Sequence, residues 1–250
     1  MKIAFSGDSF CRDITAAGKM PDTDYILLFP SWPYLVAKEQ QGTIVTSGLP
    51  GTALFHSYEN LLKHIDEVDY IIFCITDPYR LANMHSLSIV ANKKRQWPPG
   101  TFSPSKLKRL NYVINQYYAN IISFRWHEVA QKGLLMQIDE LIIQKQKKCI
   151  WFPCFEHSMQ GFVPKSGPIG NTPLIEISES ELINANMTPD EINNFFEISD
   201  SRPSTDRQLR VNHMNKENNN NMANLIIDII NNNDFTPQEI KMEKYFEILK

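Results

Sequence analysis

The chain has 250 residues, of which 42% are hydrophobic and 21% charged, and its formal net charge is −3. This balance is typical of a globular protein; it excludes a mainly disordered chain, a collagen-like chain and a small disulfide scaffold. It also argues against a strong overall attraction to nucleic acid or to an anionic membrane. The length suits one large domain or two small ones, with enough chain to bury a full core.

The four cysteines, Cys11, Cys74, Cys149 and Cys154, form no Cys-x-x-Cys pair and are too few for a disulfide framework. We therefore expect reduced thiols, as in a cytosolic protein. The first residues run directly into a short strand rather than into a signal peptide. No apolar run approaches the ~18–20 residues that span a bilayer. The sequence therefore predicts a soluble, cytoplasmic protein with no membrane partner.

The first third of the chain alternates strands and helices. Short apolar or β-branched runs predict strands at 2–5, 43–46 and 69–75. The last of these is continuously apolar, as expected of a parallel strand that is covered on both faces. A helix is expected at 30–39, where Ser31 is an N-cap candidate and Pro33 lies in the first turn. A second helix is expected at 53–65, where apolar residues recur with helical spacing.

The middle of the chain predicts a long amphipathic helix that starts at Ser105 and packs on the sheet. We expect Gly133 to interrupt it and a second helical stretch to run over 134–147. A fourth strand follows at 148–152. The glycine- and proline-rich stretch 153–172 predicts a long ordered loop or lid.

The last third predicts a fifth short strand at 174–177 and a core helix at 216–231. An amphipathic helix is expected at 236–249. The corresponding domain organisation is an α/β domain over 1–235 followed by a C-terminal helical extension over 236–250.

The alternation of strands and helices predicts a parallel sheet with helices on both faces, that is, a three-layer α/β/α sandwich. Ligands bind at the carboxyl ends of the strands in such sheets. Residues 6–11, 47–52 and 76–80 each follow a predicted strand directly. They are therefore the first places to look for chemistry.

Several residues near these strand ends could carry chemistry. Ser9 follows Gly7-Asp8, so its hydroxyl can face the crevice and its amide can point at an oxyanion, although turns of this kind are common. Gly51 offers an unobstructed amide after the second strand, or simply makes an ordinary turn. Thr76 and Asp77 would project into the same crevice, or cap the next element. His213 lies in a loop before the last core helix, where a lone histidine is more often structural.

The combination and order of these residues resemble the SGNH, or GDSL-type, hydrolase superfamily. Its first block is matched by Gly7-Asp8-Ser9, and its second-block glycine is matched best by Gly51. The third block reads Gly-x-Asn-Asp in the family and Cys-Ile-Thr-Asp at 74–77 here, so Thr76 replaces the oxyanion asparagine. The fifth block reads Asp-x-x-His in the family and Arg-Val-Asn-His at 210–213 here. The resemblance spans residues 3 to about 231 by block order, and implies a flavodoxin-like α/β/α fold.

The resemblance implies a serine-hydrolase mechanism. Ser9 would attack an ester carbonyl and His213 would accept its proton as general base. The amides of Ser9 and Gly51 would form the oxyanion hole, with the Thr76 hydroxyl as a third donor. The acid that orients His213 is left open between Asp206 and a backbone carbonyl.

Three further residues are candidates for substrate contacts. Arg210 would bind an anionic substrate group, or pair with an acid such as Asp77. His157 lies in the glycine- and proline-rich loop and either enters the crevice or stays on the surface. The basic–aromatic stretch 93–97 fits a solvated loop better than a nucleic-acid contact. No histidine pair has metal-ligand spacing, so the sequence predicts no metal and no cofactor.

The leading hypothesis is an esterase that removes O-acetyl or other short acyl groups from a carbohydrate-like substrate. An O-acyltransferase would use the same acyl-enzyme, with a sugar hydroxyl as acceptor in place of water. A non-catalytic binding module on the same fold is the third alternative, because the family's asparagine and aspartate are missing. The oligomeric state is not predicted.

Overall fold

The structure is a computed structural model of the whole chain. It describes residues 1–13, 18–19, 26–27, 30–49, 52–80, 103–121, 123–159, 161–177, 188 and 214–246.

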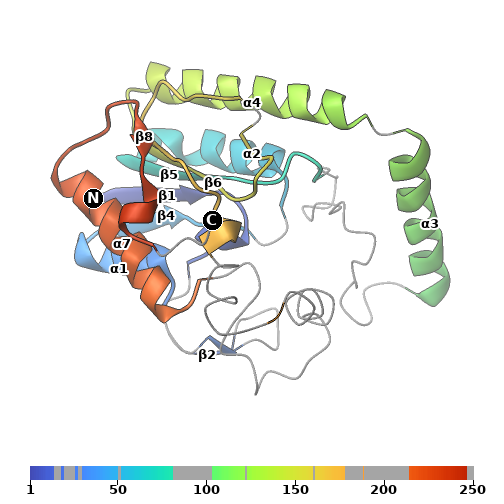
Figure 1. Cartoon of the computed structure of the whole chain (residues 1–250), viewed down its shortest axis with the longest axis horizontal. Coiled ribbons are helices and arrows are strands. Elements are labelled where there is room, and N and C mark those ends of the chain that lie inside the picture. Colours follow the sequence, from blue (N-terminus) through green and yellow to red (C-terminus); the bar gives the residue numbers. More distant parts are fainter. Residues whose placement is uncertain are drawn as a thin grey trace.

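A six-stranded, all-parallel sheet forms the centre of the molecule, so the general α/β class is confirmed (Figure 1). The strands, in sheet order, are β4 (Thr43–Thr46), β1 (Lys2–Ser6), β5 (Tyr70–Ile75), β6 (Lys148–Pro153), β7 (Ile169–Gly170) and β8 (Glu239–Ile240). A separate antiparallel pair joins β2 (Gly18–Lys19) to β3 (Ile26–Leu27).

The central strands alternate their side chains between two buried clusters, because successive strand residues point to opposite faces. In β5, Ile72 and Cys74 belong to one cluster, and Ile71, Phe73 and Ile75 to the other. Strands that are buried on both faces read as continuous apolar runs. This explains why the strands at 69–75 and 148–152 could be predicted from sequence almost to the residue, whereas the strand at 43–46 is a partly exposed edge strand that was recognised by its β-branched residues.

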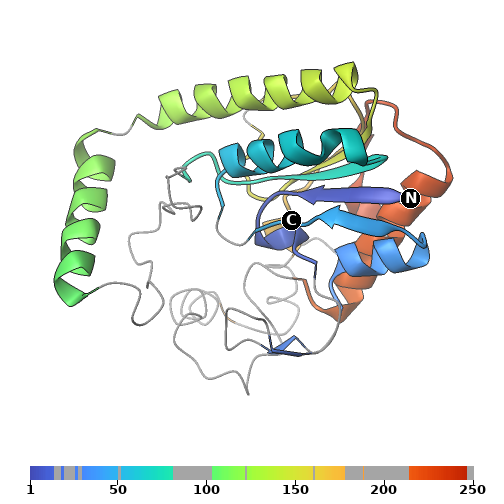
Figure 2. The same ribbon diagram turned by 180° about the vertical axis from the view of Figure 1, so that it is seen from behind.

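Helices cover both faces of the sheet. On one face, α1 (Trp32–Glu39) and α7 (Lys216–Asn231) contribute to the first cluster. On the other face, α2 (Leu54–His64) and α4 (Phe124–Gln144) contribute to the second. Figures 1 and 2 show these pairs on opposite sides of the strands. One turn of 3₁₀ helix, η2 (Ile65–Glu67), extends α2.

The predicted helix break at Gly133 is wrong. α3 (Pro104–Asn120) ends well before Gly133, and a separate helix, α4, begins at Phe124 and runs through Gly133. The Ser123 hydroxyl accepts the Trp126 N–H and so begins a new helix. A single glycine costs a helix only about 1 kcal/mol, which packing of α4 on the sheet easily offsets.

The prediction that the helix starting at Ser105 packs on the sheet is also wrong. α3 stands to the side of the sheet in both views (Figures 1 and 2). Ile121, which directly follows it, is exposed. The apolar spacing was correct for a helix, but spacing alone does not identify the surface on which a helix packs.

The predicted strand at 174–177 is helical instead. Leu174 and Ile177 are both fully buried, and their three-residue spacing places them on one face of a helical turn. The fifth strand is β7, at the end of the loop predicted for 153–172. A Cβ on Gly167 would lie 1.8 Å from the Cys149 carbonyl oxygen, so only glycine allows this loop to approach β6 so closely.

The predicted helix over 236–249 is also wrong, and with it the helical extension over 236–250. Residues 239–240 form β8, which pairs with β7 and extends the sheet, and a 3₁₀ turn, η4 (Met242–Lys244), follows. The Ile169 N–H donates to the Gln238 carbonyl at 2.9 Å. Met242 and Phe246 are buried in the same core as α7. The segment therefore belongs to the α/β core.

Within the described part of the chain, no helix is both long enough and apolar enough to span a bilayer.

Candidate functional site

The carboxyl ends of β1 and β5 meet at the point where the strand order reverses. β1 pairs with β4 on one side and with β5 on the other, so the chain moves outward in opposite directions from this point. Ligands of open α/β sheets bind in the crevice at such a switch point. Residues 7–11, after β1, and 76–80, after β5, both leave the sheet here.

The first block, Gly7–Ser9, forms a tight turn into the 3₁₀ helix η1 (Ser9–Cys11). Gly7 has φ +154°, and a Cβ there would lie 2.6 Å from the Cys74 carbonyl oxygen, so the position requires glycine. Asp8 caps η1, because its Oδ1 accepts the Phe10 N–H at 3.1 Å. The turn places Ser9 at the first position of the helix.

Ser9 is half-buried, and its hydroxyl and backbone N–H are free to bind a ligand. Neither its hydroxyl nor its backbone N–H forms a hydrogen bond with any residue that the structure describes. An N–H at the first position of a helix has no partner within the helix, and it can stabilise an anion. Ser9 therefore offers both a hydroxyl and an oxyanion donor at the switch point.

Asp8 anchors the first block to the end of β5. Its carboxylate is fully buried. Oδ2 accepts hydrogen bonds from Thr76 Oγ1 at 3.0 Å and from Arg80 Nη1 at 2.6 Å. Because a buried carboxylate needs partners of this kind, Asp8 serves to position Ser9 rather than to meet a substrate.

Arg80, which the sequence analysis missed, completes this anchor. Its side chain is only 10% exposed. Nη1 also lies 3.3 Å from the Thr52 carbonyl oxygen, and the guanidinium lies 5.1 Å from the centroid of the Phe155 ring. An arginine just after a buried strand, close to the strand end that carries Ser9, was the available signal.

Thr76 and Asp77 both have structural partners. The hydroxyl of Thr76 donates its one hydrogen to Asp8, an arrangement that does not present it to an oxyanion. The Asp77 carboxylate accepts the Tyr79 N–H at 2.8 Å and so stabilises the turn over 77–80.

Gly48 is the glycine that touches the first block. Its N–H donates to the Cys11 carbonyl at 3.0 Å, and the following N–H, of Leu49, donates to the Gly7 carbonyl at 3.3 Å. A Cβ on Gly48 would lie 2.1 Å from the Asp8 carbonyl oxygen. Gly51, the residue matched to the second block, lies outside the described residues.

Replacing Gly48 with alanine should destabilise the protein by about 2–4 kcal/mol, because the added methyl group overlaps a backbone atom that cannot move away. Urea denaturation measures this. Gly133→Ala is the matched control: nothing lies within 4 Å of its Cβ position, so a loss of stability is not expected there. Equal stability of Gly48→Ala and the wild type would refute the close approach.

Polar residues of α4 support the loops at this edge. The Gln131 amide donates to the carbonyls of Thr76 and Ser158, at 3.0 and 2.9 Å. His127 is buried, which lowers its pKa, and the hydrogen bond to the Pro78 carbonyl opposes that shift. The Tyr79 hydroxyl donates to Glu128 at 2.8 Å. Burial first, and then this carboxylate, raise the pKa of Tyr79 to about 12.

His157 is exposed, and its ring centroid lies 6.4 Å from that of Tyr79. His157 is therefore on the surface beside the turn over 77–80. Of the two positions left open by the sequence, the crevice and the surface, it occupies the surface.

The four cysteines are free and buried, as the expectation of reduced thiols requires. Cys11 and Cys154 lie next to the first block: the Cys11 thiol is 3.6 Å from the Asp8 carbonyl oxygen and the Cys154 thiol 3.8 Å from Asp8 Oδ1. Burial raises the pKa of Cys74, and it raises that of Cys154 to about 12. These thiols stay protonated at neutral pH and are poor nucleophiles.

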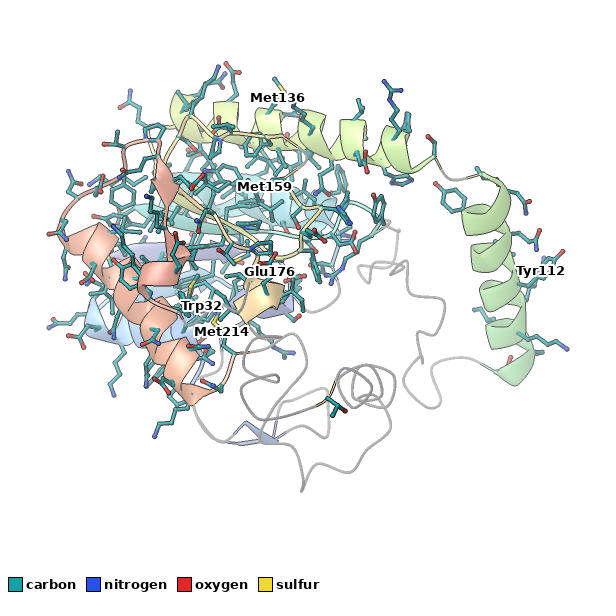
Figure 3. All side chains as sticks on the ribbon, in the orientation of Figure 1. Trp32, Tyr112, Met136, Met159, Glu176 and Met214 are labelled. Atoms are coloured by element: carbon teal, nitrogen blue, oxygen red, sulfur yellow. The ribbon has the colours of Figure 1, made fainter. Side chains whose placement is uncertain are left out.

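A buried hydrogen-bond chain joins the first block to the start of α7. Trp32 Nε1 donates to the Phe10 carbonyl at 2.8 Å, and the Trp32 N–H donates to Asn219 Oδ1 at 2.9 Å. Asn219 Nδ2 in turn donates to the Met214 carbonyl at 2.8 Å. Figure 3 shows Trp32 and Met214 close together below the sheet. Met214 is buried in the same core cluster as Phe10.

Replacing Asn219 with leucine should cost about 2–4 kcal/mol, because the Trp32 N–H and the Met214 carbonyl would lose buried partners. Thermal and urea unfolding measure the loss. Asn221→Leu, on the same helix, is the control, because its amide bonds only Asn218, at 3.4 Å. If the Asn219→Leu and Asn221→Leu variants were equally stable, the buried hydrogen bonds of Asn219 would not contribute to the stability of the protein.

His213, Asp206 and Arg210 lie outside the described residues, as does the basic–aromatic stretch 93–97. The distance from Ser9 to His213, the orienting acid and the role of Arg210 therefore stay predictions. In the described ranges, no group of three or more His, Cys, Asp and Glu side chains is arranged to hold a metal ion.

No protein-family model matches the chain, and no curated protein resembles it significantly in sequence. Function is therefore inferred from the residues at the carboxyl edge.

Proposed function

We propose that the protein is a serine ester hydrolase of the SGNH type, with Ser9 as nucleophile and His213 as general base. The observation that carries this proposal is the position of Ser9 together with its two free hydrogen-bonding groups. It lies at the switch point, and both its hydroxyl and its N–H are without partners among the described residues. A nucleophile needs a hydroxyl that is free to reach a base and a substrate.

The strand order supports the family. β7 and β8 lie at the far edge of the sheet and are counted here as one strand, the fifth. When the strands are numbered by their order along the chain, they lie across the sheet in the order 2-1-3-4-5. This is the flavodoxin-like order, whose switch point lies between the first and third strands. Ser9 follows the first of these strands.

The hydrogen-bond chain through Trp32 and Asn219 supports the choice of base. Phe10 directly follows Ser9, and Met214 directly follows His213. Three hydrogen bonds link Phe10 to Met214. Two segments that are about 200 residues apart in the sequence are thus held to one another at the residues next to the proposed nucleophile and base.

In the proposed reaction, Ser9 Oγ attacks the ester carbonyl carbon while His213 takes the hydroxyl proton. The Ser9 N–H stabilises the oxyanion. Collapse expels the alcohol, which takes the proton from His213, and leaves an acyl-Ser9 ester. A water molecule, activated by His213, then releases the carboxylic acid. The substrate proposed from the resemblance is a short acyl ester, such as an O-acetyl group on a carbohydrate.

One observation favours a second candidate, a non-catalytic binding module. The Thr76 hydroxyl is turned to Asp8, so the third oxyanion donor of the family is missing from this arrangement. Such a protein would bind its ligand at the same crevice without forming an acyl-enzyme.

A fluorophosphonate probe distinguishes the two candidates, because it phosphonylates a serine only when a base activates the hydroxyl. We expect one adduct, located on Ser9 by peptide mass spectrometry, and none in the His213→Gln variant. Labelling that is absent from the folded wild-type protein would favour the binding module. Labelling of another serine would move the chemistry elsewhere.

A further inference from the structure

α4 is apolar on two opposite faces. Its inner face packs on the sheet through Leu135, Ile138 and Ile142, which are fully buried. Its outer face carries four large apolar side chains in solvent: Trp126 is 64% exposed, Val129 64%, Met136 58% and Ile143 45%. Figure 3 shows Met136 on the side of α4 that faces away from the sheet. A helix on the surface of a monomer normally presents polar residues there, so a row of large exposed apolar side chains indicates an interface.

The exposed residues follow a heptad pattern. We define the outer seam of α4 as Trp126, Val129, Gly133, Met136, Glu140 and Ile143. The spacing alternates between three and four residues along the 21-residue helix, which is about 31 Å long. This spacing keeps one seam facing a partner helix, and it is the pattern by which helices pair through knobs and holes.

The seam is complementary to itself when two copies run antiparallel. With the two-fold axis between Leu134 and Leu135, Trp126 faces Ile143 of the second copy, and Gly133 faces Met136. Gly133 leaves a hole on the outer face, since nothing lies within 4 Å of its Cβ position. Met136 of the second copy is a flexible side chain that can fill such a hole.

Charge complementarity selects the antiparallel direction. Glu140, the acidic member of the seam, faces Val129 of the second copy. Arg125 and Lys132 of that copy lie about one turn on either side of Val129. All three charged residues are exposed. A parallel pair would instead place Glu140 against Glu140, which is repulsive.

We propose that the occupant of the outer seam is a second copy of this chain, and that α4 of each copy pairs antiparallel in a two-fold homodimer. Such a self-complementary contact between identical patches closes on itself, so it forms dimers rather than fibres. The inference is independent of the proposed hydrolase activity.

The full-length protein tests the proposal by sedimentation velocity over a concentration series. We expect a monomer–dimer equilibrium whose Kd rises at least about tenfold in Glu140→Lys, because two like-charge contacts form by symmetry. Glu39→Lys makes the same charge change on α1, away from the seam, and should leave the Kd unchanged. A protein that stays monomeric at every concentration would overturn the proposal.

The compensating variant makes the test specific. The triple variant carries Arg125→Glu, Lys132→Glu and Glu140→Lys, which reverses all three charges of the proposed contact. It should restore the wild-type Kd in the antiparallel pair. A triple variant as weak as Glu140→Lys alone would overturn the proposed pairing. It would leave a docked partner of another kind as the explanation for the seam.

Cross-linking tests the direction. Ala130 and Gln137 are exposed and flank the seam on one side, so Ala130→Cys and Gln137→Cys in one chain should join two copies through a short bis-maleimide. The native cysteines are buried and should not compete. Ala130→Cys alone should not cross-link, since antiparallel copies separate these residues by more than about 13 Å along the helix. Efficient cross-linking of that single variant would indicate a parallel pair and overturn the proposal.

Discussion

Replacing Ser9 with alanine should lower kcat for a short-chain aryl acetate by at least about 10⁴-fold, while the melting temperature changes by less than about 2 °C. The activity is lost because, in the proposed mechanism, the acyl-enzyme forms on the Ser9 hydroxyl. The stability is retained because the Ser9 hydroxyl bonds no described residue, so its removal leaves no buried partner unpaired. Steady-state hydrolysis and thermal unfolding measure the two effects.

Ser6→Ala is the matched control, three residues earlier in the chain. The Ser6 hydroxyl is buried and donates to the Ser57 carbonyl at 3.1 Å. Its removal should therefore cost about 1–2 kcal/mol of stability and leave kcat nearly unchanged. The opposite pattern, with full activity in Ser9→Ala, would exclude Ser9 as the nucleophile.

The sequence was most informative where local pattern and final environment agree. The strand at 69–75 is apolar at every position that packs, because both faces of β5 are covered, and its bounds followed directly. The core helix at 216–231 was predicted to the residue from the helical spacing of its apolar side chains, and the structure adds that the Asn215 side chain begins it by accepting the Asn218 N–H.

The errors occurred where a distant partner decides the structure. β8 has only two residues, and it is a strand because β7 lies beside it, which no local period reveals. Gly133 interrupts the helical pattern in the sequence, but the sheet under α4 holds the helix together. The reading of 174–177 as a strand was wrong for a similar reason, because an apolar run of four residues fits either a strand or a helical turn.

The candidate site also combines a residue that local sequence predicts with contacts that depend on distant partners. Ser9 was found from a local motif after a strand. The Asp8–Arg80 pair joins residues 72 positions apart, and the Trp32–Asn219 bond joins residues 187 positions apart. The place of Arg80 after a buried strand was a signal, but it did not identify Asp8 as the partner, and neither Trp32 nor Asn219 carries a signal of its own in a single sequence. Both contacts become evident only when the topology brings the ends of β1 and β5 and the start of α7 to one edge.

Replacing Arg80 with methionine should destabilise the protein by about 3–5 kcal/mol, because it leaves a fully buried carboxylate without its cationic partner. Methionine retains much of the apolar volume against Phe155, so the loss would reflect the charge and the hydrogen bonds rather than a cavity. Urea denaturation gives the change in free energy of unfolding. Arg109→Met, the same change at an exposed position of α3, should change it by less than about 0.5 kcal/mol.

The double variant Asp8→Asn with Arg80→Met measures the free energy of interaction between these two side chains, apart from their contacts with other residues. An asparagine is neutral, so the double variant should recover part of the loss seen in Arg80→Met, with a coupling of about 1–3 kcal/mol. The amide oxygen introduced by Asp8→Asn can still accept the Phe10 N–H, and this keeps the turn before Ser9 closed. Strictly additive losses would mean that Asp8 and Arg80 act separately. The ion pair would then not be what holds Ser9 at the switch point between β1 and β5.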